Sequence, residues 1–411
     1  LVELCNGCGT CRQTDENTMC PTFRASREEV QATRGRANSL RAAISGELPE
    51  DEIYSDRFQE EVLDLCVGCK GCKSDCPTGV DFAKLKAEVK HDYHQEKGTS
   101  LRSKLFGNVD TVNALGSAFA PVSNWAQKLP GSDVIAEKVL GIAPERDLPT
   151  FSNETLVGWF EERGPQVPLA EADDTVLLFP DTYTNYNYPE PGKAAVELLE
   201  AADIHVRVAD KDEVAASGRA AFSMGLLDEA EERARTNLDA LMPYVEDGWS
   251  VLFVEPSDAV MFQDEYVDLL SDDRVEDLAV AAYGVCEYLN TYQVTDGMDF
   301  DAPAEYVTYH GHCNQKALNR DHHAAAALSA AGYDVDALDS SCCGMAGSFG
   351  YEEEHYELSK AIGEILHEKV EESPGGEVVA PGASCRSQLA DDDFEGERPA
   401  HPVEKLREAL A

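Results

Sequence analysis

The sequence has few basic residues for its length and no long apolar run. It contains 34 lysines and arginines against 78 aspartates and glutamates, which gives a formal net charge of −44 over 411 residues. Such a charge repels phosphate backbones, so nucleic acid is excluded as a main partner. No stretch approaches the roughly 20 apolar residues that a membrane-spanning helix requires. Hydrophobic residues nevertheless reach 43%, which suffices for packed cores and excludes global disorder.

The excess of acidic residues predicts a surface adapted to very high salt. At molar ionic strength the Debye length shrinks to about 3 Å, and self-repulsion within the protein is screened. An ordinary acidic cytosolic protein is the alternative. We expect a cytoplasmic location, at most peripheral on the cytoplasmic membrane face. Because the chain opens at Leu1 and its first motif begins at Cys5, we also expect it to be the C-terminal piece of a longer polypeptide.

Eight of the 13 cysteines fall in two runs of matching spacing. The first is Cys5-x2-Cys8-x2-Cys11 with a later Cys20-Pro21, and the second is Cys66-x2-Cys69-x2-Cys72 with a later Cys76-Pro77. Thiolates at i, i+3 and i+6 allow a short, glycine-containing loop to curl around one face of an iron–sulfur cube. In two-cluster ferredoxins, the fourth cysteine of each run binds the other cluster.

This rule assigns the eight cysteines to two [4Fe-4S] clusters. Cluster 1 is predicted to be bound by Cys5, Cys8, Cys11 and Cys76, and cluster 2 by Cys66, Cys69, Cys72 and Cys20. Zinc is the alternative, since sites of four cysteines also bind it, but two consecutive runs each closed by Cys-Pro favour iron–sulfur clusters. Clusters with four protein ligands leave no iron open for a substrate, so we expect this region to transfer single electrons.

Composition divides the chain into three regions, and the overall prediction is an α + α/β protein. Residues 1–97 hold both runs and read as a small helical ferredoxin-type domain, in which Ser26 and Glu29 fit a capping box. Residues 98–170 read as a helical connector. Residues 171–411 alternate apolar segments such as VLLFPD (176–181) with helical segments, which predicts α/β units with parallel strands.

The connector contains an apolar stripe within residues 105–129, where Asp110 and Lys128 are the only charged residues. Its members step by three or four positions: Val112, Leu115, Phe119, Val122, Trp125 and Leu129. Pro121 should kink or break this helix. The favoured interpretation is a helix packed against a neighbouring domain. The alternative is a contact surface for a membrane or a partner subunit.

An internal repeat is visible in the α/β region, with units at 171–300 and 301–411. FPDTYTNYN (179–187) aligns with YHGHCNQKA (309–317), so Tyr183 lies opposite Cys313. The segment ASG (216–218) aligns with CCG (342–344), and EPSDA aligns with the GASC stretch, which places Asp258 opposite Cys385. The first unit therefore lacks cysteine at every matched position, whereas the second retains it.

The second unit predicts a further site, because its cysteines follow predicted strands, where α/β sheets place ligands. These are Cys313, Cys342, Cys343 and Cys385. They could bind a third iron–sulfur centre, zinc or another metal, perform thiol redox chemistry, or form a metal-free remnant. Neighbouring residues could tune a potential, bind an anion or be structural: His310, His312, Lys316 and Arg386. Elsewhere, Cys286 reads as a buried core thiol.

The paired runs together with DSSCCGMAGSFG and GASCRSQ resemble the iron–sulfur region of FAD-linked D-2-hydroxyacid dehydrogenases of the D-lactate, glycolate and D-2-hydroxyglutarate types. The layout is also similar to the C subunit of anaerobic glycerol-3-phosphate dehydrogenase and to the subunits of heterodisulfide reductase. The resemblance covers nearly all of the chain. It implies that FAD on a missing domain or partner oxidises the hydroxyacid, and that electrons pass singly through the clusters to a quinone or another carrier.

Two departures weaken a heterodisulfide reductase assignment. The first unit has Tyr183, Ala216, Ser217 and Asp258 in place of cysteines. The second ends in Cys385-Arg-Ser-Gln388, so a closing C-x-x-C is only half present. The alternatives that stay open are a thiol reductase that uses the C-terminal cysteines, the iron–sulfur subunit of an anaerobic glycerol-3-phosphate dehydrogenase, and a stand-alone carrier.

Overall fold

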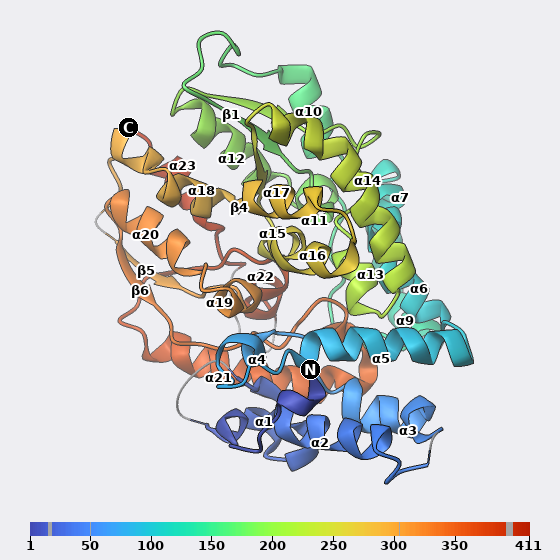
Figure 1. The fold of residues 1–411 in the computed structure, drawn as a ribbon. Coiled ribbons are helices and arrows are strands. Elements are labelled where there is room, and N and C mark those ends of the chain that lie inside the picture. Colours follow the sequence, from blue (N-terminus) through green and yellow to red (C-terminus); the bar gives the residue numbers. More distant parts are fainter. Residues whose placement is uncertain (15–18, 50, 304, 392–397) are drawn as a thin grey trace.

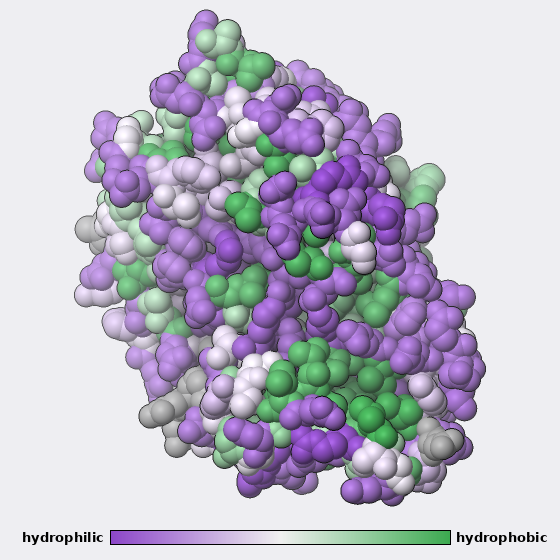
Figure 2. Space-filling model, viewed as in Figure 1, coloured by the Kyte–Doolittle hydropathy of each residue, from purple (hydrophilic) through white to green (hydrophobic). Residues whose placement is uncertain are grey.

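The structure, a computed structural model, describes residues 1–14, 19–49, 51–303, 305–391 and 398–411. It is rich in helix and contains two small, fully parallel sheets, as the α + α/β prediction requires (Figure 1). The N-terminal region lies along one end of the α/β part (Figure 1). The face in view is largely hydrophilic, and its largest hydrophobic area lies over that N-terminal region (Figure 2).

The N-terminal region consists of short helices around its cysteines. Its elements are η1 (Val2–Leu4), η2 (Thr10–Arg12), α1 (Pro21–Ser26), η3 (Glu29–Gln31), α2 (Thr33–Ile44), η4 (Glu52–Tyr54), α3 (Asp56–Phe58), η5 (Gln59–Leu63), α4 (Gly71–Ser74) and α5 (Phe82–Lys97). The side chains of Cys11, Cys20 and Cys72 belong to its buried core. The predicted capping box is wrong, because Ser26 ends α1 and Glu29 forms an ion pair with Arg34.

The connector is helical, as predicted. It contains α6 (Leu101–Gly107), α7 (Val109–Ala118), α8 (Val122–Gln127), α9 (Ser132–Leu140) and α10 (Leu156–Arg163). The predicted break at Pro121 is confirmed, since this residue separates α7 from α8. None of the described helices is both long and apolar enough to cross a bilayer.

The first sheet has the strand order β2-β1-β3-β4. Its region contains β1 (Asp174–Leu178), α11 (Thr182–Tyr186), α12 (Glu190–Glu200), β2 (Ile204–Val208), α13 (Arg219–Ser223), α14 (Leu227–Glu246), β3 (Ser250–Phe253), α15 (Pro256–Val260), η6 (Met261–Glu265), α16 (Tyr266–Leu269), α17 (Arg274–Ala281), β4 (Ala282–Gly284), α18 (Val285–Thr291) and η7 (Val294–Gly297). Strand β4 was missed, because three residues are too few for a recognisable pattern.

The second sheet has the strand order β6-β5-β7, which repeats the β2-β1-β3 arrangement of the first. Its region contains β5 (Tyr306–Tyr309), α19 (Cys313–Ala317), α20 (His322–Ala330), β6 (Asp334–Ala337), η8 (Phe349–Tyr351), η9 (Glu353–His355), α21 (Tyr356–Glu372), β7 (Glu377–Val379), α22 (Ala383–Leu389) and α23 (Pro402–Glu408). The strands of both sheets are parallel and alternate with helices, as the sequence predicted.

The two sheets share one hydrophobic core. Val176 and Leu178 of β1 belong to the same buried cluster as Val307 and Tyr309 of β5. Helix α23, at the end of the chain, packs against α12 of the first sheet. Helix α21 of the second sheet packs against α1, and so joins the N-terminal region to the α/β part. Cys286 lies in the shared core, as predicted.

Candidate metal centres

The first cysteine run forms a loop between η1 and η2. Cys8 is exposed, whereas Cys11 is buried. Gly9 adopts a φ of 81°, in the left-handed region that glycine tolerates best, and this lets the loop reverse. The backbone N–H of Arg34 donates to Cys11 Sγ at 3.3 Å, and burial raises the pKa of this thiol to about 11. Such a thiol is a poor nucleophile but a suitable ligand, because a bound metal replaces its proton.

The second run lies around a cavity together with a cysteine from the first. The cavity is lined by Cys20, Cys66, Cys69 and Cys72, and Arg36 forms part of its wall. The structure thus brings together the four cysteines that the spacing rule assigned to cluster 2. Arg36 is buried and directs Nη1 toward Cys20 Sγ at 3.6 Å. Burial acts to raise the pKa of Cys20, but the nearby Arg36 charge outweighs burial and lowers this pKa below its ordinary value.

Cys76 does not line this cavity and lies near Cys8 instead. Burial and the charge of Cys8 act to raise the pKa of Cys76, but hydrogen bonds from Thr78 and Val80 lower it overall. Cys5 likewise lies close enough to Cys11 for its charge to affect that thiol. The charge of Cys20, assigned to cluster 2, also acts on Cys11, so the two predicted ligand sets adjoin one another here.

Both runs close with Cys-Pro-Thr, and the threonine extends the Cys-Pro pattern by one residue. The Thr22 hydroxyl lies 3.3 Å from Cys20 Sγ, and the Thr78 hydroxyl lies 3.4 Å from Cys76 Sγ. Hydrogen-bond donors beside thiolate sulfur stabilise its negative charge. The signal that could have identified both threonines is their identical position, two residues after each fourth cysteine.

Sulfur spacing separates an iron–sulfur cube from a zinc site. Zn–S bonds of about 2.3 Å in a tetrahedron hold the sulfurs about 3.8 Å apart. Within the described ranges, the only three ligating side chains with all ligand atoms within 4.8 Å of one another are Glu352, Glu354 and His355. No three sulfurs of the described cysteines are that close. The described cysteines therefore show no trio of sulfurs packed as closely as a zinc-bound set.

The four C-terminal cysteines converge beyond the carboxyl ends of β5, β6 and β7, as predicted. Three of them, Cys342, Cys343 and Cys385, are at most 2% exposed. Hydrogen bonds from the Cys342 and Cys385 thiols hold the pKa of Cys343 well below its ordinary value. A hydrogen bond also joins Cys342 to Cys313, which is partly exposed. The arrangement is a continuous chain of four sulfurs, the donor set that iron–sulfur centres use.

Both predicted histidines are buried beside these thiols. Nδ1 of His310 lies 2.7 Å from the Ser340 hydroxyl, and its Nε2 has no hydrogen-bond partner among the described residues. Burial lowers the pKa of His310 to about 3 and that of His312 to about 4. Both rings are therefore neutral at pH 7, and they surround the sulfurs with uncharged groups.

The two predicted cations bind backbone carbonyls. Lys316 donates to the carbonyl of Ser340 at 2.7 Å, and Arg386 donates to the carbonyl of Pro399 at 2.9 Å. These contacts hold the loops that carry the cysteines. They give both residues a structural role, which the sequence analysis had left open beside anion binding.

The second cysteine run faces the C-terminal cysteines. Burial raises the pKa of Cys69 well above its ordinary value, and the nearby charge of Cys313 adds to this effect. The side-chain amide of Asn314, the residue after Cys313, donates to the carbonyl of Gly68 at 3.3 Å. Helix α4 packs against α19 at the same place. The tertiary fold thus joins two sites that are far apart in the sequence.

Three matched positions of the first unit, Tyr183, Ser217 and Asp258, also lie together, but they carry oxygen in place of sulfur. The Ser217 hydroxyl donates to the Asp258 carboxylate. Burial raises the pKa of Asp258, and burial together with the Glu255 charge raises that of Asp181 to about 7. Glu255 accepts a hydrogen bond from the backbone N–H of Ala383 in the second unit, at 2.9 Å. This buried acidic group therefore adjoins the C-terminal cysteines.

The connector helix α7 packs against α11 of the neighbouring α/β region, as favoured, but not through the apolar stripe, which points away from the protein. Leu115, Phe119, Val122 and Trp125 are 59–67% exposed. The opposite side of α7 packs through polar residues: Asn113 donates to the Asn187 side chain at 2.7 Å, and Ser117 donates to the Ser152 carbonyl at 2.7 Å. Helical periodicity identified the apolar side of the helix correctly but not the side that packs.

Two family descriptions match parts of the chain. Residues 2–80 match a 4Fe-4S dicluster domain, and residues 307–390 match a domain described as cysteine-rich. These matches cover the two regions in which the structure gathers cysteines, and they confirm the resemblance drawn from the motifs.

Curated relatives match the chain along almost its whole length. It is 27% identical to the C subunit of anaerobic glycerol-3-phosphate dehydrogenase of Escherichia coli (strain K12), over 100% of this chain and 98% of that protein. It is 22% identical to the glycolate oxidase iron-sulfur subunit of the same strain, over 100% and 94%. It is also 24% identical to D-2-hydroxyglutarate dehydrogenase of that strain, over 99% of this chain but 43% of that longer protein.

Proposed function

We propose that this chain is the iron–sulfur, electron-transfer module of a flavin-linked D-2-hydroxyacid dehydrogenase. FAD on a domain or partner outside this chain would oxidise the hydroxyacid, and a quinone or another carrier would accept the electrons. The observation that carries the proposal is the cavity at which Cys20 joins Cys66, Cys69 and Cys72. It follows the crossed pattern of two-cluster ferredoxins, and a dicluster family match covers residues 2–80.

The ligand sets we propose are those of the spacing rule. Cys5, Cys8, Cys11 and Cys76 would hold cluster 1, and Cys66, Cys69, Cys72 and Cys20 would hold cluster 2. Bound [4Fe-4S] clusters accept and release single electrons. The protein contributes sulfur ligands, buried surroundings, and donors that favour the thiolate form, among them Arg36 at Cys20 and the Phe82 N–H at 3.3 Å from Cys72 Sγ.

We further propose that Cys313, Cys342, Cys343 and Cys385 hold a third iron–sulfur centre. Support comes from the chain of four sulfurs and from the position of Cys313 beside Cys69. We assign residues 1–97 to the ferredoxin-type domain, 98–170 to the connector, and 171–300 and 301–411 to two copies of one α/β unit. The equal strand orders β2-β1-β3 and β6-β5-β7 support the duplication.

Two other functions are alternatives to this proposal. The full-length similarity to the C subunit of anaerobic glycerol-3-phosphate dehydrogenase favours that substrate class for the missing flavin part. A thiol reductase that uses the C-terminal cysteines would need access for a disulfide substrate. Cys342, Cys343 and Cys385 are at most 2% exposed, so burial argues against this second role.

Iron and acid-labile sulfide counting with EPR, on protein purified and reduced without oxygen, tests the proposal. Two clusters predict about eight irons per chain, and a third centre predicts more. Colourless protein that holds zinc in place of iron would reject the assignment. If the Cys342→Ser/Cys343→Ser double variant retains hydroxyacid oxidation with an artificial acceptor, when combined with its flavin partner, the thiol reductase alternative is rejected.

For the exposed stripe within residues 105–129, we propose peripheral contact with the cytoplasmic face of a membrane. Phe119 and Trp125 are 67% and 64% exposed, and Asp110 and Lys128 are the only charged residues of the segment. Because the net charge of −44 disfavours anionic lipid, contact would rest on apolar insertion. Sedimentation with phosphatidylcholine vesicles should fall in Phe119→Glu and Trp125→Glu but not in Val280→Glu, a control on α17. If the wild-type protein does not sediment, membrane contact is rejected and a partner protein is left as the binding partner of the stripe.

A further inference from the structure

Lys70 occupies an unusual backbone position inside the second cysteine run. It lies between Cys69 and Cys72 with a φ of 60°, in the left-handed region that residues with a Cβ rarely adopt. The equivalent position of the first run, between Cys8 and Cys11, is Gly9, which has a φ of 81°. Glycine would meet this backbone requirement at lower cost. A side chain kept at such a position indicates that the side chain itself has a role.

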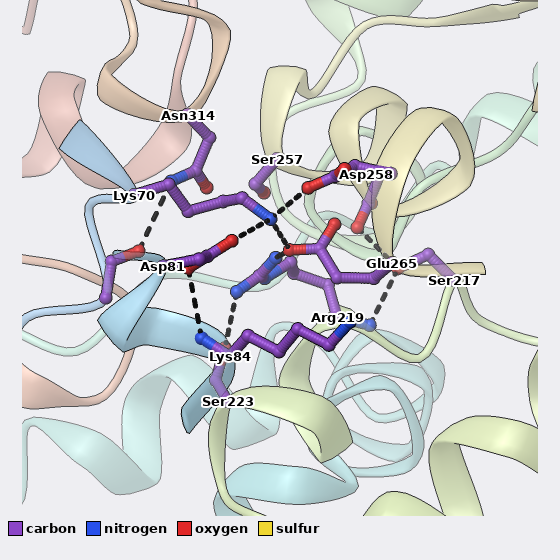
Figure 3. A network of polar contacts seen from close by, with 12 residues as sticks. Lys70, Asp81, Lys84, Ser217, Arg219, Ser223, Ser257, Asp258, Glu265 and Asn314 are labelled. Carbon is purple, nitrogen blue, oxygen red and sulfur yellow. Dashed lines mark hydrogen bonds and ion pairs between the residues drawn. The ribbon is translucent and has the colours of Figure 1, made fainter. Parts of the chain in front are cut away.

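The side chain of Lys70 is buried and ion-paired across the domain boundary. Its residue is 2% exposed, and Nζ contacts Glu265 at 2.6 Å as well as Asp264, both in η6 of the first α/β unit. Asp81, within the N-terminal region, lies 3.9 Å away. Figure 3 shows Lys70 extending from the cysteine loop toward Glu265. Arg219 approaches the same Glu265 oxygen with Nη1 at 2.7 Å.

The same loop is attached to the second α/β unit on its other side. The carbonyl of Gly68, two residues before Lys70, accepts the hydrogen bond from Asn314 at 3.3 Å. Cys69 lies between these two attachments and close to Cys313. Residues on both sides of one cysteine are therefore fixed to different α/β units, and this fixes where Cys69 lies relative to Cys313.

We propose that Lys70 is a positioning residue, which clamps the Cys66–Cys72 loop to the first α/β unit and so holds the centre bound by this loop beside the Cys313 site. The proposal rests on the proposed function, because it concerns transfer between two of the centres named there. A buried lysine paired with carboxylates is held firmly, since removal of one partner leaves an uncompensated charge. Its positive charge also stabilises the reduced, more negative state of a nearby cluster.

Lys70→Gly is the sharpest variant, because it removes the side chain while meeting the backbone requirement as Gly9 does. Hydrogen–deuterium exchange of the anaerobically purified holoprotein should show amides within 64–76 and 258–270 exchanging about a hundredfold faster than in wild type. Lys70→Arg retains the cation and should restore most of the protection. Lys97→Met, at an exposed lysine of the same region, is the matched control and should change neither segment.

The midpoint potential of cluster 2 provides a second readout, because loosening of the Cys66–Cys72 loop alone would not shift it in the direction set by the lost charge. Redox titration followed by EPR should place the cluster 2 midpoint of Lys70→Gly at a more negative potential, because a positive charge is lost. Glu265→Gln, which alters the opposite side of the clamp, should move it to a more positive potential and expose the same 64–76 segment. Unchanged exchange in both variants, or potential shifts of the same sign, would overturn the proposal.

Failure of the clamp and failure of the proposed function give different results. If Lys70→Gly does not fold or loses iron, Glu265→Gln still tests the clamp from the other domain. If wild-type protein binds no iron–sulfur cluster, the electron-transfer function fails, yet exchange in the metal-free protein still reports whether Lys70 holds the loop. If all variants retain full iron and wild-type exchange, only the clamp is rejected.

Discussion

The two parallel sheets have the same strand order around β1 and β5 but carry different chemistry at their carboxyl ends. The second sheet gathers four cysteines there, whereas the first gathers Tyr183, Ser217 and Asp258 at the matched positions. In both places the groups still contact one another, as the Ser217–Asp258 and Cys342–Cys343 hydrogen bonds show. The comparison teaches that this scaffold does not need sulfur ligands to keep its shape, because a buried polar network can replace them.

The difference also changes what each site does with charge. Thiolates in the second unit can be neutralised by a bound metal. In the first unit, carboxyl groups take the place of thiolates. Burial raises the pKa of Glu255 and Asp258, so these groups keep their protons to a higher pH than usual. Burial thus favours the uncharged form of these acidic groups beside the second site.

The largest effect should come from Cys343→Ser, compared with Ser217→Ala at the matched position of the first unit. Cys343 lies at the middle of the sulfur chain, so its loss should remove all iron bound at the C-terminal site while both N-terminal clusters remain. Ser217→Ala should leave the iron content unchanged. Iron and sulfide counts with EPR provide the measurement. Equal iron in wild type and Cys343→Ser would show that the C-terminal cysteines bind no iron.

The pH dependence of stability should come from the first unit. The pKa of Asp181 is raised from 3.8 to about 7, so the protonated form adds stability that is complete below about pH 4 and is lost as the pH rises through about 7. The loss for this group is at most about 4 kcal/mol. Asp181→Asn cannot ionise and should flatten the decline between pH 5 and 7.5, measured by urea unfolding. The exposed control Asp212→Asn should keep the wild-type slope, and an equal slope in Asp181→Asn would contradict the assignment.

The smallest expected difference between the units is their response to salt. Residues 171–300 contain 7 basic and 30 acidic residues, and residues 301–411 contain 8 and 22. Molar KCl should raise the melting temperature of the whole protein, because repulsion between acidic groups is screened. Amide exchange should slow more in the first unit than in the second. A melting temperature that does not change with salt would remove the proposed adaptation to high salt.

Motifs with a fixed physical requirement were predictable from the sequence. The runs at Cys5–Cys11 and Cys66–Cys72 imply curled loops wherever they occur, and the apolar segments of β1 and β5 imply buried parallel strands. Strand β4 escaped because its three residues, Ala-Tyr-Gly, carry no periodic pattern. The capping box at Ser26 failed because a local pattern of four residues competes with the end of α1.

The outward stripe on α7 and α8 shows a different limit. Hydrophobic periodicity gives the apolar side of a helix, but a helix can pack through hydrogen-bonded polar residues, as Asn113 and Ser117 do here. Only the neighbours of α7 reveal this choice. Likewise, the sequence does not reveal that the Lys70 side chain is buried and ion-paired, whereas Lys97 is exposed.

The sequence by itself determined the kinds of ligand, their grouping along the chain and the alternation of strands and helices, because these follow from local spacing and side-chain chemistry. Only the tertiary structure decided that Cys69 faces Cys313, that Lys70 reaches Glu265 and that Glu255 adjoins Ala383. These contacts join residues more than a hundred positions apart. They depend on how whole domains pack, and the free energy of that packing is spread over many residues instead of residing in one motif.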